Sequence, residues 1–241
     1  MSPKYQAPVT FGVGGTRTKA AIIFIGLAVL SQFLGSLSYL IWPQRASPSG
    51  SGLSTLTGLP GVAVGIGVLI SFILWFFRAY KNIILFPAAG RRFSPGWAVA
   101  GYLIPFLNFV IPFLVIREIW KVSTPGLDET DTFAWHKASV APFIFTWWIF
   151  FLLAQITSLT GTMTVAFWNT LNKQKIISQP VPVKFFAWVI ALSGLLFITA
   201  SLLQIRMIKR IDERQAVKYH ELRKHQKQES GRPLPSYGGS A

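Results

Sequence analysis

The sequence predicts an all-α fold, that of a polytopic helical membrane protein with four transmembrane helices and one proline-broken segment that is re-entrant or interfacial. Three observations predict it. Only 13% of the residues are charged, against about a quarter in a typical soluble domain. Five long stretches carry no charge, and each is near the ~20 residues that a helix needs to cross a bilayer. The basic residues are concentrated in a few segments between these stretches. The stretches cover residues 20–42, 59–77, 95–116, 138–172 and 185–205.

The first apolar stretch predicts a retained transmembrane helix over residues 20–42. It is longer than the core of a secretory signal, which has roughly 7–15 residues, and no clear small-residue cleavage site follows it. Residues 1–19 are expected to form a cytoplasmic N-terminal arm that is flexible around Gly12, Gly14 and Gly15. Residues 43–58 are rich in Ser, Gly and Pro, which predicts a flexible external loop.

The second apolar stretch predicts a transmembrane helix over residues 59–77. It contains Gly61, Gly65 and Gly67, a small-residue pattern that lets another helix approach closely. The sequence leaves open whether that helix belongs to the same chain or to a second copy in a homo-oligomer.

The middle stretch, residues 95–116, has reasons not to cross as a plain helix. Pro95, Pro105 and Pro112 each lack a backbone donor, and the latter two break or kink a helix. The distribution of Lys and Arg also indicates that this stretch does not cross the membrane. Four crossings without this stretch place 19 of the 23 basic residues on one side and four on the other, whereas five crossings divide them 10 to 13. The positive-inside rule therefore favours four crossings with both termini in the cytoplasm. A kinked spanning helix is the alternative.

The last two apolar stretches predict transmembrane helices over residues 138–160 and 185–205. The second continues without a helix breaker into a basic cytoplasmic tail, residues 211–241, predicted to be helical to about Gln226 and disordered from Glu229 onward. Its basic side chains are suited to anionic membrane lipids or to a partner. A purely topological anchor is the alternative. No nucleic-acid-binding module is recognisable, so nucleic acid is not expected as a partner.

The most distinctive part of the chain lies between residues 75 and 120. Its pattern W-x-x-R-x-Y-x-N, then S-P-G-W-A, then I-P-x-x-N-x-x-x-P and R-E-I-W, resembles a bacterial multi-pass membrane family catalogued as domain of unknown function 4328. The resemblance implies a bacterial cell membrane but no particular activity. The matching residues are Trp75, Arg78, Tyr80, Asn82, Ser94, Pro95, Gly96, Trp97, Pro105, Asn108, Pro112, Arg117, Glu118 and Trp120.

The same residues, apart from Gly96, form the candidate binding set. One hypothesis is a ligand or lipid-headgroup pocket made by Arg78, Tyr80, Asn82, Asn108 and Glu118. In the alternative, they only fix a broken helix at the membrane interface, where amphipathic aromatic rings are favoured. Glu118 is expected to pair with Arg78 or a neighbouring basic side chain, and Asn108 with backbone freed by Pro112.

Several kinds of chemistry are not expected. The chain has no cysteine, which excludes thiolate metal sites, disulfides and cysteine nucleophiles. The predicted spans hold no Asp, Glu, Lys, Arg or His, which argues against proton relays and intramembrane catalysis. Asp128, Glu129 and Asp131 are clustered but match no calcium loop, so a solvated turn is expected. The sequence predicts no catalytic residue, metal site or cofactor.

These observations favour a non-enzymatic scaffold or interaction protein whose basic tail binds lipid or a partner. A channel or transporter with a cavity lined by residues 95–116 is the main alternative, because broken helices build such sites. A lipid-modifying enzyme that uses Glu118 or the acidic cluster is less favoured, because no acid–base pair or nucleophile arrangement is visible.

Overall fold

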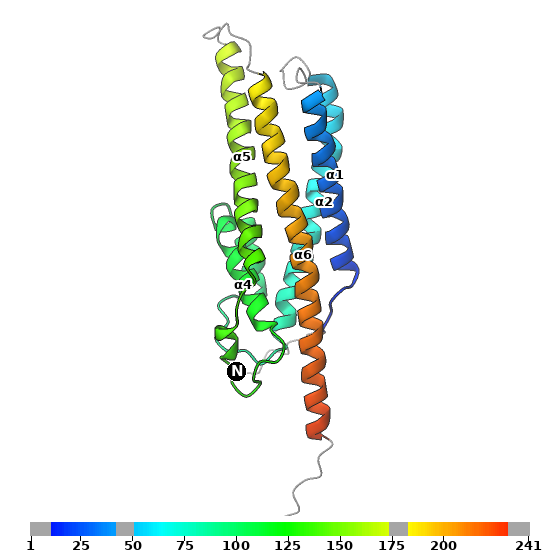
Figure 1. The fold of residues 1–241 in the computed structure, drawn as a ribbon, viewed down its shortest axis with the longest axis vertical. Helices are drawn as coiled ribbons and strands as arrows, with labels where there is room; N and C mark the ends of the chain where they lie inside the picture. The colour runs from blue at the N-terminus through cyan, green and yellow to red at the C-terminus, as the bar shows by residue number, and fades with distance from the viewer. Residues whose placement is uncertain (1–10, 42–50, 174–182, 231–241) are drawn as a thin grey trace, which may run out of the picture.

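The computed structural model describes residues 11–41, 51–173 and 183–230, and these residues are helical or lie in short connections. Four long helices dominate them, and two short helices and two 3₁₀ turns lie between the second and third long helices (Figure 1). The long helices are α1 (Thr16–Ile41), α2 (Ser51–Ile83), α5 (Pro142–Lys173) and α6 (Val183–Ser230). The short helices are α3 (Pro95–Leu103) and α4 (Ile111–Val122), and the 3₁₀ turns are η3 (Leu107–Phe109) and η4 (Ala134–Lys137).

The four long helices are those that can cross a membrane by length and composition, which confirms the predicted fold class. Their candidate spans have mean hydropathies between 1.6 and 2.2. Large apolar side chains on these helices, such as Ile23, Val62 and Phe167, are about 60% exposed, as expected where lipid replaces water. Helices α3 and α4 have 9 and 12 residues, too few for a span of ~20. The helical segments that contain these candidate spans are Thr16–Leu37, Pro60–Ile83, Pro142–Thr160 and Trp188–Gln228.

The helix boundaries differ from the predicted ones in several places. Helix α5 continues to Lys173, past the predicted limit at residue 160, and α6 continues to Ser230, past the predicted limit near Gln226 and into the residues predicted to be disordered. Helix α1 begins at Thr16, inside the predicted arm. Helix α2 begins at Ser51, so residues 51–58 are helical and the prediction of a loop there is wrong. Ser, Thr and Gly in this stretch are weak helix formers, but a helix already formed by the following apolar residues extends at little cost. The predicted arm up to residue 10, loop residues 43–50 and the tail after Ser230 lie outside the described residues.

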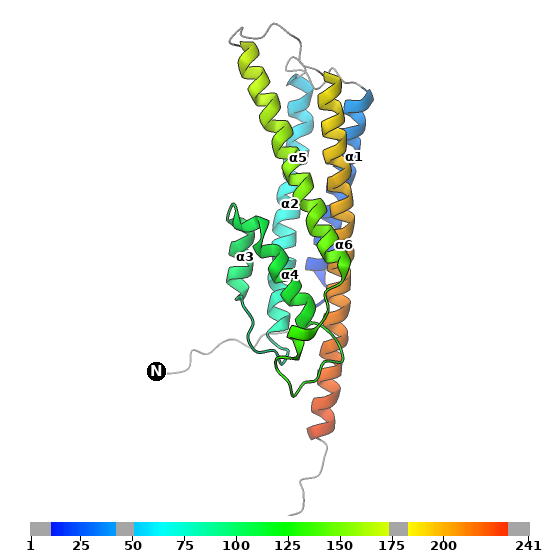
Figure 2. The ribbon, with the colours of Figure 1, turned by 60° about the vertical axis from the view of Figure 1, so that its left-hand side comes forward.

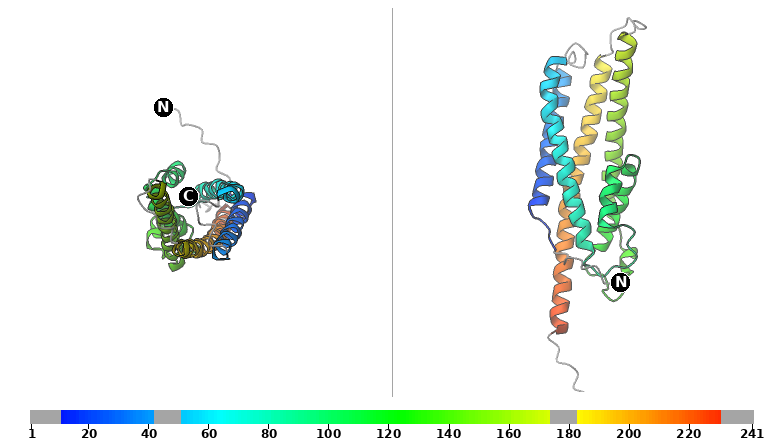
Figure 3. Two further views of the ribbon diagram at one scale, coloured as in Figure 1. Left: turned by 90° about the horizontal axis from the view of Figure 1, so that it is seen from above. Right: turned by 180° about the vertical axis from the view of Figure 1, so that it is seen from behind.

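The long helices pack in the order α5, α6, α1, α2, and α3 and α4 contact α2 and α5. Viewed along the long axis, they form a curved row that this short helical hairpin completes (Figure 3). The start of α1, the end of α2, the start of α5 and the C-terminal part of α6 lie at one end of the molecule (Figure 1). Residues 84–141 therefore leave and return at the same end, the hairpin end, as four crossings require.

Proline and glycine build the hairpin. Ser94 caps α3, its Oγ accepting from the Trp97 amide at 3.2 Å, and Pro95 occupies the first turn. After Pro105 the chain turns through Phe106, which has a φ of 68°. Helix α4 then starts with Pro112 in its first turn. A Cβ on Gly101 would lie 2.3 Å from Ile111 Cγ2, so glycine is what allows α3 to touch α4 (Figure 2).

The hairpin lies beside the charged part of α6, and most of the buried core lies there too. Arg214 Nη2 donates to Thr124 Oγ1 at 2.7 Å, and Lys218 Nζ donates to the Val122 carbonyl at 2.8 Å. The C-terminal turn of α4 is thus level with residues 214–218, beyond the apolar part of α6. The largest fully buried side chains cluster around it and on the facing part of α2, and include Trp75, Phe76, Ile116, Ile119, Met207 and Ile208.

The three glycines of the predicted small-residue pattern, Gly61, Gly65 and Gly67, do not share one face of α2. A Cβ on Gly67 would lie 2.3 Å from the Phe24 ring of α1, whereas one on Gly61 or Gly65 would meet nothing within 4 Å. Six residues along a helix rotate the side chain by about 240°, so Gly61 and Gly67 point apart. Gly67 therefore serves packing within the chain, and a homo-oligomer contact at Gly61 and Gly65 stays a prediction.

Gly67→Ala should lower the free energy of unfolding by about 1–3 kcal/mol, because the Phe24 ring must move and α1 must separate from α2. Gly61→Ala, in the same helix, is the matched control and should leave stability unchanged or raise it slightly through better helix propensity. Thermal unfolding of both variants in detergent micelles measures the difference. Equal midpoints for the two variants would show that the α1–α2 contact is not tight.

Candidate functional site

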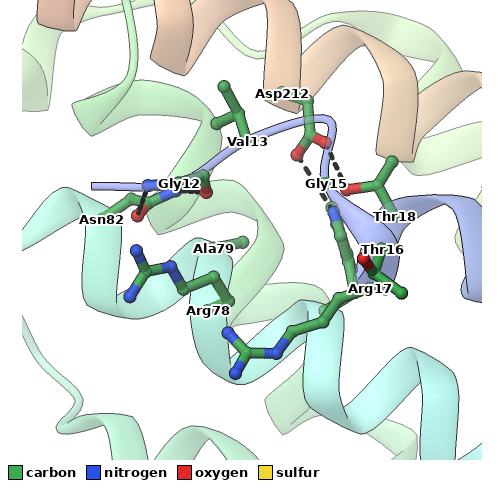
Figure 4. Close-up of a pocket in the computed structure, with 11 residues that line it drawn as sticks. Gly12, Val13, Gly15, Thr16, Arg17, Thr18, Arg78, Ala79, Asn82 and Asp212 are labelled. Carbon is green, nitrogen blue, oxygen red and sulfur yellow. Dashed lines mark hydrogen bonds between the residues drawn. The ribbon is translucent and has the colours of Figure 1, made fainter. Parts of the chain in front are cut away.

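A buried carboxylate ties three distant segments together at the hairpin end. Asp212 of α6 is 8% exposed. Its Oδ2 accepts hydrogen bonds from the Gly14 amide at 2.9 Å and from Thr18 Oγ1 at 2.6 Å. Its Oδ1 accepts from Trp75 Nε1 at 3.0 Å. The N-terminal segment, α2 and α6 are thereby joined through one side chain (Figure 4).

A second polar group lies about two turns farther along α2 and one turn farther along α6. The Asn82 amide donates to Gln215 Oε1 at 2.7 Å and to the Gly12 carbonyl at 2.8 Å, and its Oδ1 accepts from the Gly12 amide at 3.3 Å. Gln215 in turn donates to the Ala79 carbonyl at 2.9 Å. The Asn82 side chain thus holds the backbone of Gly12, as Asp212 holds the amide of Gly14.

These groups border a pocket of about 310 Å³ between the start of α1, the end of α2 and α6 (Figure 4). Two arginines line it, Arg17 from the first turn of α1 and Arg78 from α2. Gly12 passes over Arg78 so closely that a Cβ there would lie 2.8 Å from Nη2. The remaining lining residues are Val13, Gly15, Thr16, Thr18, Trp75, Ala79, Asn82 and Asp212.

Tyr80 and Glu118 meet on the other side of α2, against the hairpin. Glu118 is 4% exposed. Its Oε1 accepts from the Tyr80 hydroxyl at 2.6 Å and its Oε2 from the Arg92 amide at 3.0 Å. The Tyr80 hydroxyl also contacts the Phe93 carbonyl. Glu118 therefore does not pair with Arg78, and it anchors both α2 and the chain before α3.

The five residues expected to form one pocket are separated by helix geometry. Arg78 and Asn82 are four apart on α2 and share a face, while Tyr80 between them points away by about 160°. Glu118 lies on the Tyr80 side of α2, and Asn108 lies in the turn between α3 and α4. The Asn108 Oδ1 is buried and accepts no hydrogen bond from any described residue. The predicted bond to backbone freed by Pro112 is not seen for this atom.

The other candidate residues lie in α2, in the hairpin or next to it. Trp75 shares the face of Arg78 and Asn82 and donates to Asp212. Trp97 is 60% exposed. Arg117 lies over the Phe113 ring at 5.5 Å, and Trp120 lies under Arg214 at 4.1 Å. Ser94, Pro95, Pro105 and Pro112 delimit α3 and α4.

Sequence reasoning missed the polar residues of α6 that complete the site, Asp212 and Gln215. A signal was present. Met207, Ile208 and Ile211 are apolar at spacings of three and four within a charged segment, which marks a buried helical face. Residues 212, 215 and 218 fall on that face, and all three are buried. Thr18 and the amide of Gly14 carried no comparable signal.

The acidic cluster forms turns of its own. Asp128 Oδ1 accepts from the Thr130 amide at 2.9 Å and from Thr130 Oγ1 at 2.7 Å. These hydrogen bonds hold the pKa of Asp128 below its usual range. Asp131 Oδ1 accepts from the Phe133 amide at 2.9 Å. Within the described part of the chain no group of three or more His, Cys, Asp or Glu side chains is placed to hold a metal ion.

Fold and site together define a polytopic helical membrane protein whose buried polar contacts lie at one end of the bundle. The chain belongs to the family described as Domain of unknown function (DUF4328), whose sequence profile matches residues 38–213. This confirms the resemblance carried by residues 75–120. No curated protein and no solved structure matches the chain significantly.

Proposed function

We propose that this protein is a non-enzymatic interaction protein that holds a rigid basic helix at the cytoplasmic face of a bacterial cell membrane and presents it to an acidic partner. The observation that carries the proposal is the continuity of α6, a single helix from Val183 to Ser230. The 24 residues after Arg206 extend roughly 36 Å at 1.5 Å per residue. The extension reaches beyond the rest of the bundle (Figure 1).

Buried contacts make the extension rigid where it leaves the bundle. Asp212 and Gln215 fix it to α2 and the N-terminal segment. Lys218 donates to the Val122 carbonyl at the end of α4, and Arg214 donates to the Thr124 hydroxyl just after that helix. A cation at a helix C-terminus is electrostatically favourable. The Phe11 ring stacks on Tyr219, with centroids 3.9 Å apart. Two of the tail's basic residues therefore serve packing rather than recognition.

The basic residues beyond these anchors are exposed. Arg223, Lys224 and Lys227 lie on the last turns of α6 and all three side chains are accessible. Because they lie several turns past the apolar part of α6, they are better placed for a soluble acidic surface than for lipid. Lys209 and Arg210, next to Arg206, are exposed closer to the apolar span, where anionic headgroups would add roughly 1 kcal/mol per charge.

The proposed orientation rests on charge. Among the described residues, basic side chains from α1, α2, α4 and α6 and from the connections around the hairpin gather at the hairpin end. By the positive-inside rule that end faces the cytoplasm, with both termini on that side.

The structure does not favour the alternatives. The hairpin interior is filled by apolar contacts, with the Tyr102 ring 5.5 Å from Phe72 and 6.5 Å from Phe76, which disfavours a channel lined by residues 95–116. Glu118 is bound on both oxygens by the protein itself, which disfavours its use in a lipid-modifying enzyme.

A photo-crosslinking amino acid at Gln228, in cells that make the full chain, tests the proposal. We expect one acidic cytoplasmic protein to be captured. The yield should fall about tenfold when Arg223, Lys224 and Lys227 are all changed to Gln, because complementary charge raises association rates. The control changes Lys19, Arg92 and Lys137 to Gln, three exposed charges at the same end. Equal loss in both variants, adducts with lipid alone, or capture of a protein from the other side of the membrane would contradict the proposal.

A further inference from the structure

We propose that the pocket between α1, α2 and α6 binds a phosphate group, which Arg17 and Arg78 hold at the membrane interface. The pocket measures about 310 Å³, more than a phosphate ion fills, so there is room for the remainder of a phosphate-bearing molecule. This proposal is independent of the basic extension of α6, because none of the exposed basic residues of that extension lines the pocket.

Two guanidinium groups give the pocket its positive character. Arg17 enters from the first turn of α1 and Arg78 from α2, and Figure 4 draws both side chains on the same side of the Gly12–Gly15 segment. Two like charges around one cavity repel each other, and a bound anion relieves that repulsion. The guanidinium fork also matches the oxygen geometry of phosphate and can hold it with paired hydrogen bonds.

The backbone around the arginines suits the same ligand. The amides in the first turn of α1, from Thr16 to Thr18, have no acceptor within the helix, and the positive end of the helix dipole lies there. Gly12 and Gly15 border the pocket without side chains, which lets a ligand approach the main chain. The turn through Gly14, at a φ of 62°, directs that residue's own amide to Asp212 rather than to the cavity.

Asp212 also lines the pocket, but its charge is engaged by the protein. Its two oxygens accept three hydrogen bonds, from the Gly14 amide, Thr18 and Trp75. The charged residues that line the pocket are therefore two arginines and one carboxylate, and the carboxylate is already hydrogen-bonded. The positive end of the α1 dipole adds to the positive charge around the cavity. The net field in the cavity favours an anion.

The pocket's position leaves two sources for the phosphate. Arg17 and Arg78 lie near the hairpin-end limits of the apolar parts of α1 and α2, the depth at which lipid phosphates lie. A free phosphate compound from the adjoining aqueous phase reaches the same depth. Both sources offer the same chemistry to the two arginines, so the experiment separates them by probe.

Isothermal titration calorimetry of the full chain in an uncharged detergent tests the site. The probes are inorganic phosphate, short-chain phosphatidylglycerol, and the diacylglycerol of the same chains, which lacks phosphate. We expect at least one phosphate probe to bind and diacylglycerol not to. Arg17→Gln and Arg78→Gln should each weaken binding about tenfold, since each removes a charge-assisted contact. Lys19→Gln, an exposed charge in the same turn region that does not line the pocket, should leave it unchanged.

Each outcome bears on the proposal. Binding of phosphatidylglycerol alone supports a lipid headgroup, and binding of inorganic phosphate supports a free ligand. No binding of either phosphate probe by folded protein overturns the proposal, as does binding that is equally strong in Arg17→Gln and Lys19→Gln. Arg17 is exposed, so its variant keeps the test decisive even if Arg78→Gln fails to fold.

Discussion

Replacing Asp212 with alanine is expected to lower the free energy of unfolding by about 3 kcal/mol. The change removes the acceptor for Trp75 Nε1 and Thr18 Oγ1, both in buried residues, and for the Gly14 amide. A buried donor without an acceptor costs about 1–3 kcal/mol, more when the lost partner was charged. Thermal and denaturant unfolding of the protein in detergent micelles measures the loss.

The neighbouring residue provides the control for Asp212. Glu213 forms an ion pair with Arg210 at 3.1 Å in which both side chains are more than half exposed. Glu213→Ala makes the same change in net charge but should alter stability by less than about 0.5 kcal/mol. If both alanine variants unfold at the same midpoint, Asp212 does not join the three segments. Asp212→Asn should fall between wild type and alanine, because an amide oxygen still accepts hydrogen bonds but its NH₂ group cannot.

The membrane architecture was predictable because local composition determines it. Charge-free stretches mark spans wherever they are long enough, and the prolines at 95, 105 and 112 mark the limits of two short helices. The Lys and Arg distribution then separates the hairpin from the spans. None of these inferences requires knowing which helices touch.

The polar site was only partly predictable because its contacts are between residues far apart in the chain. Trp75, Arg78 and Asn82 were found through a motif, and their spacing places them on one face of α2. Asp212, the partner of Trp75, is 137 residues away from it, and Gln215, the partner of Asn82, is 133 residues away. Nothing in the local sequence pairs them. Arg17 and the backbone of residues 12–15 become part of a pocket only because α1 packs between α2 and α6.

The basic tail shows how a structure divides residues that composition treats alike. By charge alone, every Lys and Arg after residue 205 is a candidate for lipid or partner binding. In the structure Lys218 is 5% exposed and donates to a carbonyl, and Arg214 lies over the Trp120 ring. Arg223 and Lys224 stay exposed. Lys218 and Arg214 therefore serve packing, and the proposed recognition is left to the exposed basic residues at the end of α6.

Replacing Glu118 with alanine is expected to loosen the hairpin from α2 and to lower stability by about 2 kcal/mol. The Arg92 amide loses its acceptor, and the Tyr80 hydroxyl loses the carboxylate. The change also removes the acid from a pocket lined by Arg92, Arg117 and Lys121, so like charges are left facing one another. Both effects act on the segment that leads into α3.

A single cysteine reports the loosening directly, because the chain has no cysteine of its own. Ala98 of α3 is fully buried, so Ala98→Cys should react slowly with a thiol reagent in otherwise unchanged protein. Adding Glu118→Ala should raise the labelling rate at least tenfold. Adding Arg117→Ala, which removes an exposed neighbour of Glu118, should raise the labelling rate much less.

In a double-mutant cycle, Tyr80→Phe and Glu118→Gln should couple, because the two side chains share a hydrogen bond. Equal labelling rates with and without Glu118, or strictly additive stability losses, would mean that the hairpin is held by its apolar contacts alone.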